Sequence, residues 1–311
     1  MSRPPGSTVG GQAVIEGVMM RAPSKWAVAV RRPDGVIAVR SDPLPRLSSR
    51  SRLARIPFIR GVMVLGESLS LGFRALSWSA RKAGTEEGVE ELKTGHIISA
   101  MVVALVVFVG FFMLLPLLAA RGAEKVFGDS AILFNVVDGL VRVLLFVGYI
   151  WAIGRSKDIK RVFEFHGAEH KTIHAYEAGD PLTMDEIQKY SPRHPRCGTN
   201  FLLIVILIAV VVFTIVGRPA LIWLITSRIV LIPVIAGIAY EVLKAASDRP
   251  WLAVASKPGI WLQRLTTAEP SSDQVEVAVA SLLIALDDEE RQAVEARGPV
   301  IPGALAYEVG A

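Results

Sequence analysis

A long apolar run without charge most constrains what this chain can fold into. Residues 97–120 form 24 consecutive positions that carry no charged side chain. At about 1.5 Å per residue, a helix of this length exceeds the roughly 30 Å hydrocarbon core of a bilayer. Lipid offers no hydrogen-bond partners, so the run must be helical. The 52% hydrophobic content and the mean hydropathy of +0.45 agree with a membrane protein and argue against a soluble chain.

Three further apolar segments follow, at residues 131–153, 201–216 and 220–240. We therefore predict a mainly α-helical, polytopic membrane protein with about four transmembrane helices, the last two forming a helical hairpin. Asp138 and Arg142 lie four residues apart in the second segment and can pair on one helix face. Charges inside a span indicate either a structural ion pair or a pathway for ions.

The distribution of Lys and Arg predicts the orientation of the chain. Fifteen precede residue 97, eight lie in 154–200 and six follow residue 240, whereas the 121–130 loop has two and the 217–219 turn has one. The positive-inside rule then puts both termini and the 154–200 segment in the cytoplasm, which requires an even number of spans. Because the net charge of +5 is accounted for in this way, we expect membrane lipids and no nucleic acid as partners. We also expect no cleavable signal peptide and no internal disulfide framework.

The same patterns divide the chain into four regions. They are an N-terminal cytoplasmic segment with a β-hairpin (1–56), an amphipathic or interfacial helix region (57–95), a transmembrane bundle (96–243) with a His-rich cytoplasmic insert (154–200), and a C-terminal cytoplasmic region (244–311). The hairpin is predicted from alternating runs at 26–31 and 36–40 around the turn Pro33-Asp34-Gly35.

Two helices and a loose end are predicted outside the spans. Charges recur every seven positions at 60, 67 and 74, so they share one face of a helix over 57–80 that lies on the membrane or on the bundle. Apolar residues at helical spacing predict a cytoplasmic helix that begins near Ser272 or Asp273. The Gly and Pro residues of 297–311 predict a loosely ordered end.

The stretch 163–201 is chemically the richest, because it holds four of the five histidines and the only cysteine. His166, His170 and His174 are spaced by four and so form one stripe on a helix. Two imidazoles one turn apart can bind a single metal ion, as they do in zinc enzymes. Glu169 completes a His-x-x-Glu-His pattern and has the offset of a general base that activates water.

Cys197 and His194 add a thiolate and an imidazole, which suit a borderline-soft cation, so we expect a divalent metal, with zinc favoured. The expected ligands are His166, His170, His174 and Cys197, with His194 as a supporting or alternative ligand. Other interpretations stay open. The histidines can be a solvated helix face, and Cys197 can be a small buried residue or a nucleophile with His194 as its base.

The N-terminal stretch GGQAVIEGVMMR contains a second candidate feature. Gln12 and Glu16 are four residues apart and would share one face if the stretch were helical. They are then either a solvated surface turn, or Glu16 reaches the metal site, since the glycines on each side permit close approach of the backbone.

Five motifs resemble those of the bacterial YqhQ-like membrane proteins, a family of unknown function described as predicted metal-dependent enzymes. They are GGQAVIEGVMMR, FEFHGAEHKTIHAYE, HPRCGTNFL, AGIAYE and LTTAEPSSDQVEVAVASL, and they span Gly10 to Leu286. The resemblance implies a multi-pass protein of the bacterial inner membrane. The family's motif positions correspond to Gln12, Glu16, His166, Glu169, His170, His174, Glu177, His194, Cys197 and Glu241. The resemblance thus implies additional supporting or alternative ligands beside His194, namely Gln12, Glu16, Glu177 and Glu241.

Three functions follow from these observations. The first is a metal-dependent hydrolase at the cytoplasmic membrane surface, where Lys171, Arg193 and Arg196 would favour substrates with phosphate or carboxylate groups. The second is a non-catalytic membrane module in which the metal is structural and the spans serve transport, protein insertion or binding of a membrane-protein partner. The third is a channel or transporter, for which four spans would require a homo-oligomer to enclose a pore.

Overall fold

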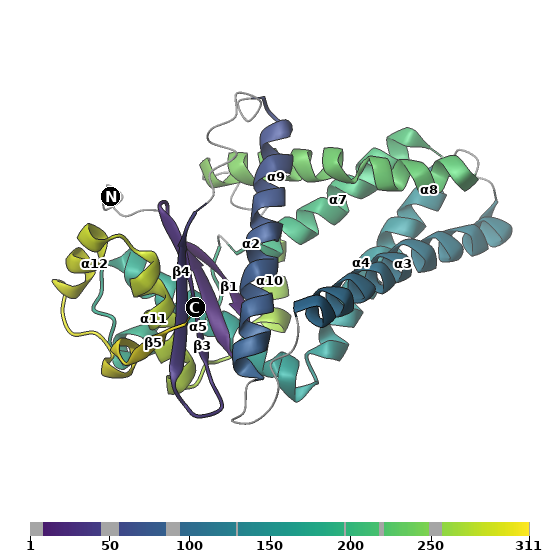
Figure 1. The fold of residues 1–311 in the computed structure, drawn as a ribbon. Helices are drawn as coiled ribbons and strands as arrows, with labels where there is room; N and C mark the ends of the chain where they lie inside the picture. The colour runs from purple at the N-terminus through teal and green to yellow at the C-terminus, as the bar shows by residue number, and fades with distance from the viewer. Residues whose placement is uncertain are drawn as a thin grey trace.

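The computed structural model describes residues 9–44, 56–84, 94–128, 130–195, 197–217, 221–248 and 257–310. These residues form two lobes (Figure 1). One is a β-sheet covered by helices on both faces, and the other is a bundle of long apolar helices.

The sheet has five strands in chain order, β1 (Gly10–Val14), β2 (Gly17–Arg21), β3 (Lys25–Arg31), β4 (Ile37–Pro43) and β5 (Tyr307–Val309). Neighbouring strands are antiparallel except β4 and β5, which are parallel. The predicted hairpin over 26–40 is therefore confirmed, but it is the middle of a larger sheet. The prediction of a loose end over 297–311 is wrong, because residues 307–309 form the edge strand β5.

Strand β3 explains why the sheet is covered on both sides. Its residues Trp26 to Val30 are all buried, which is typical of a strand that lies between two layers rather than facing water. Ala27 and Ala29 belong to the cluster shared with the helices α5 (Lys157–Ala178) and α11 (Ser272–Ala285). Trp26 and Val28 pack on the other face against helix α2 (Ile59–Ala83).

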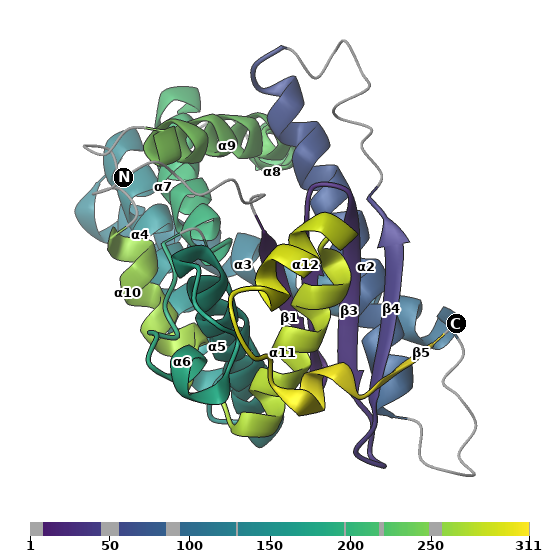
Figure 2. The same ribbon diagram turned by 90° about the vertical axis from the view of Figure 1, so that its left-hand side faces the viewer.

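Helix α11 lies directly on the sheet, with α5 beside it (Figure 2). It is buried all round, rather than on a single apolar face, so it is the central helix of the lobe. Its N-cap is Ser271, one residue before the predicted start. The short helices α6 (Met184–Gln188) and α12 (Asp288–Glu295) and the 3-10 turn η3 (Pro302–Leu305) complete this lobe.

The second lobe contains α3 (Thr94–Phe127), α4 (Ala131–Ile153), α7 (Thr199–Val216), α8 (Leu221–Val230) and α9 (Ile232–Asp248), with α10 (Lys257–Thr266) at its border with the sheet lobe. Among the described residues, three stretches are long and apolar enough to cross a membrane, namely Ile98–Val126, Ile132–Ile153 and Thr226–Ala245. Phe201–Val216 is apolar but shorter. The segment predicted as one helix over 220–240 is interrupted at Leu231, two residues before Pro233.

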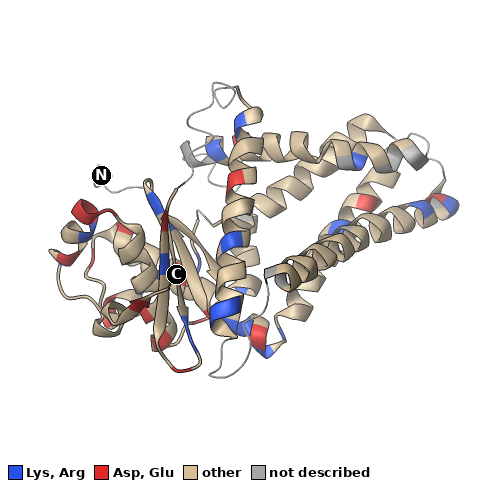
Figure 3. Ribbon diagram, in the orientation of Figure 1, with Lys and Arg blue, Asp and Glu red and all other residues tan. Residues whose placement is uncertain are grey.

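Charges are sparse along the helices of this lobe and frequent in the sheet lobe (Figure 3). Many large apolar side chains of α3 are exposed, as expected for a surface that contacts lipid. Inside the bundle, the predicted Asp138–Arg142 pair forms at 3.1 Å, and Arg228 of α8 joins it at 2.8 Å from the same carboxylate. Asp138 and Arg228 are both buried, so this cluster ties α4 to α8.

Candidate metal centre

Helix α5 carries the histidine stripe and supplies the framework of the site. The stretch from Gly167 to Ile173 is buried, although it contains Glu169, His170 and Lys171. Gly167 explains how a polar helix becomes enclosed. A Cβ at this position would lie 2.0 Å from the carbonyl oxygen of Ala268, so only glycine lets the segment after α10 cross α5 so closely.

Three side chains converge on one point. One ligand atom from each of His166, His170 and Cys197 lies within 4.8 Å of the other two. The Nε2 atom of His166 is 3.3 Å from the Sγ atom of Cys197. The two imidazoles are 4.4 Å apart between ring centroids. Helix α5 contributes the histidines, and the turn before α7 contributes the cysteine.

Backbone carbonyl groups orient both imidazoles. The Nδ1 atom of His166 lies 2.8 Å from the carbonyl oxygen of Thr266, and Nδ1 of His170 lies 2.7 Å from that of Pro192. A carbonyl oxygen only accepts, so in each ring Nδ1 must carry the hydrogen and Nε2 has the lone pair. This is the arrangement found behind metal-ligating histidines, in which a second partner fixes the tautomer.

The environment keeps His170 neutral. Burial, together with the neighbouring His166, lowers the pKa of His170 to about 2. A neutral imidazole does not have to release a proton before it binds a metal. Burial also raises the pKa of the Cys197 thiol, although hydrogen bonds from the Thr199 hydroxyl and backbone N–H, at 3.2 and 3.4 Å from Sγ, act in the opposite direction. Loss of the thiol proton would therefore need a nearby cation.

Glu169 is enclosed next to the three converging side chains but is not one of them. The N–H group of Gly11 in β1 donates to its carboxylate, and its Oε2 atom has no hydrogen-bond partner. Burial raises its pKa to about 8, and the electrostatic interaction with His166 opposes this shift. A Cβ at Gly11 would lie 2.9 Å from the carboxylate, so the strand approaches Glu169 closely because it has a glycine there.

The other two histidines of the stretch form a separate pair. His174 and His194 are 4.4 Å apart between ring centroids, and His174 stacks on Tyr190. The Nε2–H group of His174 donates to the carbonyl of Arg193 at 3.0 Å, and Nε2 of His194 lies 3.4 Å from a carboxylate oxygen of Glu177. Burial lowers the pKa of His194 to about 4. The structure thus brings His166, His170 and Cys197 together and leaves His174 outside that group.

The N-terminal candidates lie on a β-hairpin, so the helical interpretation of Gln12 and Glu16 is wrong. Gln12 is in β1 and its amide faces Gly72 of α2, on the side of the sheet away from Glu169. Glu16 occupies the turn between β1 and β2 with a φ of 53° and pairs with Arg161 of α5 at 2.5 Å. It therefore fixes the hairpin to α5, away from the converging side chains.

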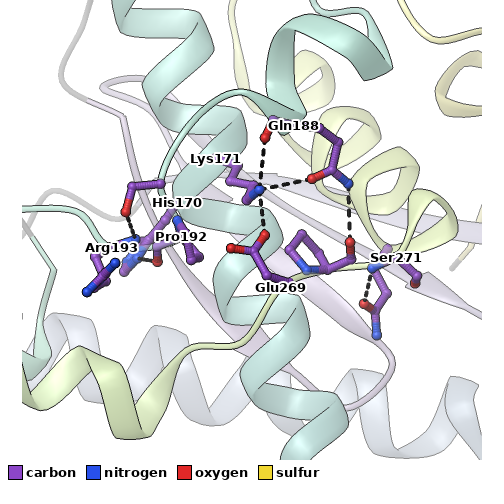
Figure 4. A network of polar contacts seen from close by, with 10 residues as sticks. His170, Lys171, Gln188, Pro192, Arg193, Glu269 and Ser271 are labelled. Atoms are coloured by element: carbon purple, nitrogen blue, oxygen red, sulfur yellow. Dashed lines mark hydrogen bonds and ion pairs between the residues drawn. The ribbon is translucent and has the colours of Figure 1, made fainter.

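Two further candidates have structural partners. Glu241 of α9 accepts a two-pronged hydrogen bond from Arg60 of α2 at 2.6 and 2.8 Å, which joins the two lobes. Lys171 is buried and donates to the backbone and side-chain oxygens of Gln188, and it pairs with Glu269 at 2.6 Å (Figure 4). Its charge thus attaches the end of α6 and the loop that contains Glu269 to α5. Arg196 lies outside the described residues.

Several residues that build the site were missed from the sequence. These residues hold the converging side chains by hydrogen bonds or make room for them, but none is a His, Cys, Asp or Glu. They are Gly11, Gly167, Thr266 and Gln263. Gln263 of α10 makes two hydrogen bonds with the backbone of His194, at 2.8 and 2.9 Å. The only signal was the Gly-rich N-terminal motif and the glycine directly after His166, since glycines inside polar motifs often mark close backbone approach.

Comparison with known proteins decides the family. A model of a family described as a protein of unknown function, DUF1385, matches residues 56–288. The uncharacterized protein YqhQ of Bacillus subtilis (strain 168) is 35% identical over 288 residues, which are 88% of this chain and 90% of the relative. The chain belongs to the DUF1385 family. The predicted YqhQ-like resemblance is therefore confirmed. No solved structure matches this DUF1385 protein.

The DUF1385 match and the YqhQ alignment differ in their extent. The family model begins at residue 56, after the strands β1 to β4, and ends at residue 288, before β5. It includes the converging side chains and all of α11, but not Gly11 of β1. The enclosure of Glu169 in this DUF1385 protein therefore draws on a strand outside the matched region.

Proposed function

We propose that this protein is a membrane-associated, metal-dependent hydrolase in which His166, His170 and Cys197 bind a divalent cation and Glu169 is the general base. The observation that carries the proposal is the convergence of three donor atoms of which two are already oriented by backbone carbonyls. Two ligands of one zinc ion lie roughly 3.3–3.7 Å apart at tetrahedral angles, and the 3.3 Å between His166 Nε2 and Cys197 Sγ fits this range. The mixed nitrogen and sulfur donor set favours zinc.

Within the part of the chain that the structure describes, three protein ligands converge, and this number favours catalysis over a purely structural role. Structural zinc sites have four protein ligands, whereas catalytic sites have three and keep one position for water or substrate. A cation bound here would supply Lewis-acid chemistry, polarising a carbonyl or phosphoryl oxygen and making water more acidic. A cation bound nearby would also lower the raised pKa of Glu169, so that the ionised carboxylate could accept the proton released from that water. The hydrogen bond from Gly11 holds the carboxylate in place, and Oε2 is the oxygen left to accept.

Metal content tests the ligand set. Mass spectrometry of the purified protein should find about one zinc per chain in the wild type and much less in the His166→Ala, His170→Ala and Cys197→Ser variants. His96→Ala is the matched control, because it removes the one histidine outside the stretch and should leave the metal content unchanged. His174→Ala should also keep the metal, since its ring lies outside the converging group. Equal metal in every variant would refute the site.

A second candidate function is a non-catalytic module with a structural metal. One observation favours it. The hydrogen bonds of His166 and His170 attach the segments around Thr266 and Pro192 to α5, so a cation there would fasten three segments together. Glu169→Gln separates the two candidates. If the variant keeps its metal and fold but no longer hydrolyses carboxylic and phosphate esters that the wild type cleaves, the enzyme is supported. Equal activity in both proteins would exclude Glu169 as the general base.

For the membrane arrangement, we infer four crossings of the bacterial inner membrane, by α3, α4, α7 and the α8–α9 pair, with the sheet lobe and both termini in the cytoplasm. Support comes from the excess of Lys and Arg in the segments that build the sheet lobe. The interrupted α8–α9 pair is consistent with a span, because proline is tolerated in such helices where neighbours re-satisfy the backbone. Reporter fusions after residues 128 and 217 should be active outside the cytoplasm. A fusion after residue 217 that is active only in the cytoplasm would contradict this topology.

A further inference from the structure

Helix α10 has two faces of different chemistry. Its buried face consists of Gly259, Leu262, Gln263 and Thr266. Its exposed residues Lys257, Trp261 and Arg264 are spaced by four and three, so they lie together on the opposite face. The helix contains no acidic residue. The helix lies at the edge of the molecule (Figure 2), and the three side chains of its outer face are exposed.

The position of α10 along the bundle puts this outer face at the end of a candidate span. Leu262 packs with Phe146 and Ile150 of α4, whose apolar stretch ends at Ile153. The last turn of α4 also has the side chains of a membrane interface. Trp151 is 52% exposed, and the guanidinium group of Arg155 lies 3.8 Å from the centroid of its ring. Tryptophan with neighbouring Lys or Arg is typical of the level of the lipid headgroups.

The buried face of α10 supports the candidate metal centre. Gln263 makes two hydrogen bonds with the backbone of His194, three residues before Cys197. Thr266, the last residue of α10, accepts the hydrogen bond from Nδ1 of His166. A contact that holds α10 in place therefore also holds His166 and the loop that carries Cys197.

From these observations we propose that Lys257, Trp261 and Arg264 bind the phosphate groups of anionic lipids, and that this contact holds α10 in the position that supports His166 and the 194–197 turn. The two cations complement the negative charge of the headgroups, and the indole ring of Trp261 is a side chain typical of the membrane interface. The inference is independent of the proposed hydrolase, because it concerns the outer face of α10 and does not need a metal at the site.

The first test compares lipid affinities of the full chain. Native mass spectrometry in detergent should show that phosphatidylglycerol binds more tightly than phosphatidylcholine. The double variant Lys257→Gln/Arg264→Gln should reduce this preference about 30-fold, which is about 2 kcal/mol when each cation contributes about 1 kcal/mol and a factor of ten is 1.4 kcal/mol. Arg32→Gln/Arg40→Gln removes the same charge from the partly exposed β3–β4 hairpin and should keep the preference. An unchanged preference in the α10 variant would overturn the proposal.

The second test measures the coupling to the site by hydrogen exchange in nanodiscs. Replacing about a third of the phosphatidylcholine with phosphatidylglycerol should slow the exchange of backbone amides in residues 263–268 and 194–199. The α10 double variant should lose this effect, and the hairpin control should retain it. If phosphatidylglycerol binds but exchange in these two segments does not change in the wild type, the proposed support of the site by lipid is wrong.

Discussion

Replacing Gly167 by alanine tests the geometry on which the site depends. The new Cβ would lie 2.0 Å from the carbonyl oxygen of Ala268 and 3.3 Å from Cβ of Pro192. The first neighbour is backbone, so it can yield only if the segment after α10 moves away from α5. That movement would break the hydrogen bond from Ala268 N–H to the Phe163 carbonyl, at 2.9 Å, and the one from His166 to Thr266, at 2.8 Å.

The size of the effect can be worked out from these contacts. Overpacking costs about 1–3 kcal/mol, and each lost hydrogen bond costs about 0.5–1.5 kcal/mol. Alanine regains about 1 kcal/mol of helix propensity, so the net loss is about 1–5 kcal/mol out of a typical total of about 5–15 kcal/mol. The metal content should fall as well, because His166 loses the carbonyl that orients it.

The assay is thermal unfolding of the full chain in detergent, followed by tryptophan fluorescence, together with metal analysis. Gly66→Ala is the matched control, since this helical glycine of α2 has nothing within 4 Å of the added Cβ. It should unfold at the same or a slightly higher temperature than the wild type. A Gly167→Ala protein with wild-type stability and wild-type metal content would refute the close packing of the 266–268 segment on α5.

Three further predictions follow from the same contacts. In chelator-treated protein, burial raises the pKa of Glu169 from 4.5 to about 8. Between these two pH values the folded state holds a proton that the unfolded state has released. The contribution of Glu169 to stability therefore falls as the pH rises from 4.5 to 8. Glu169→Gln should flatten this fall between pH 6.5 and 8 in urea titrations, and an equal slope in both proteins would contradict the raised pKa. Below pH 6.5 the lowered pKa of His170 acts in the opposite sense, because the unfolded state then binds the extra proton and stability is lost as the pH falls. Asp138→Asn should lower the free energy of unfolding by about 3–5 kcal/mol, because it leaves the buried Arg228 without its counterion, and the loss is measured as a lower unfolding temperature. Unchanged stability would show that this ion pair does not hold α4 to α8. Gly11→Ala should lower stability by about 1–3 kcal/mol, because the new Cβ would lie 2.7 Å from the Met19 carbonyl oxygen and 2.9 Å from the Glu169 carboxylate, and stability equal to that of the wild type would contradict the close packing of β1 on β2 and on Glu169.

The elements with a strong periodic signal were predicted correctly from the sequence. The charge-free run over 97–120, the segment 131–153, the hairpin over 26–40 and the helix of the histidine stripe all have the expected structure. The pairing of Asp138 with Arg142 was also predictable, because residues four apart on a helix are neighbours. Arg228 could not be assigned to the same carboxylate, since its partner comes from a different helix.

The errors arose where long-range contacts decide local structure. The stretch around Gln12 and Glu16 has no clear period, and it becomes two strands because β3 and α11 provide a sheet edge and a covering layer. The Gly and Pro residues of 297–311 suggested a loose end, but β4 offers an unpaired edge to which residues 307–309 bind. Helix α11 was predicted with one apolar face, and its full burial follows only from its place between the sheet and α5.

The sequence by itself determined that the chain contains membrane-length helices and that its cysteine and four of its five histidines gather in one stretch, because both depend on composition and on spacing along the chain. Only the tertiary structure decided that His166 and His170 meet Cys197 while His174 turns to His194, and that Glu169 is enclosed by a strand more than 150 positions earlier. The physical reason is that these outcomes depend on where backbone carbonyl and N–H groups of distant segments come to lie. Those groups are the same in every residue, so no side-chain pattern marks them in advance.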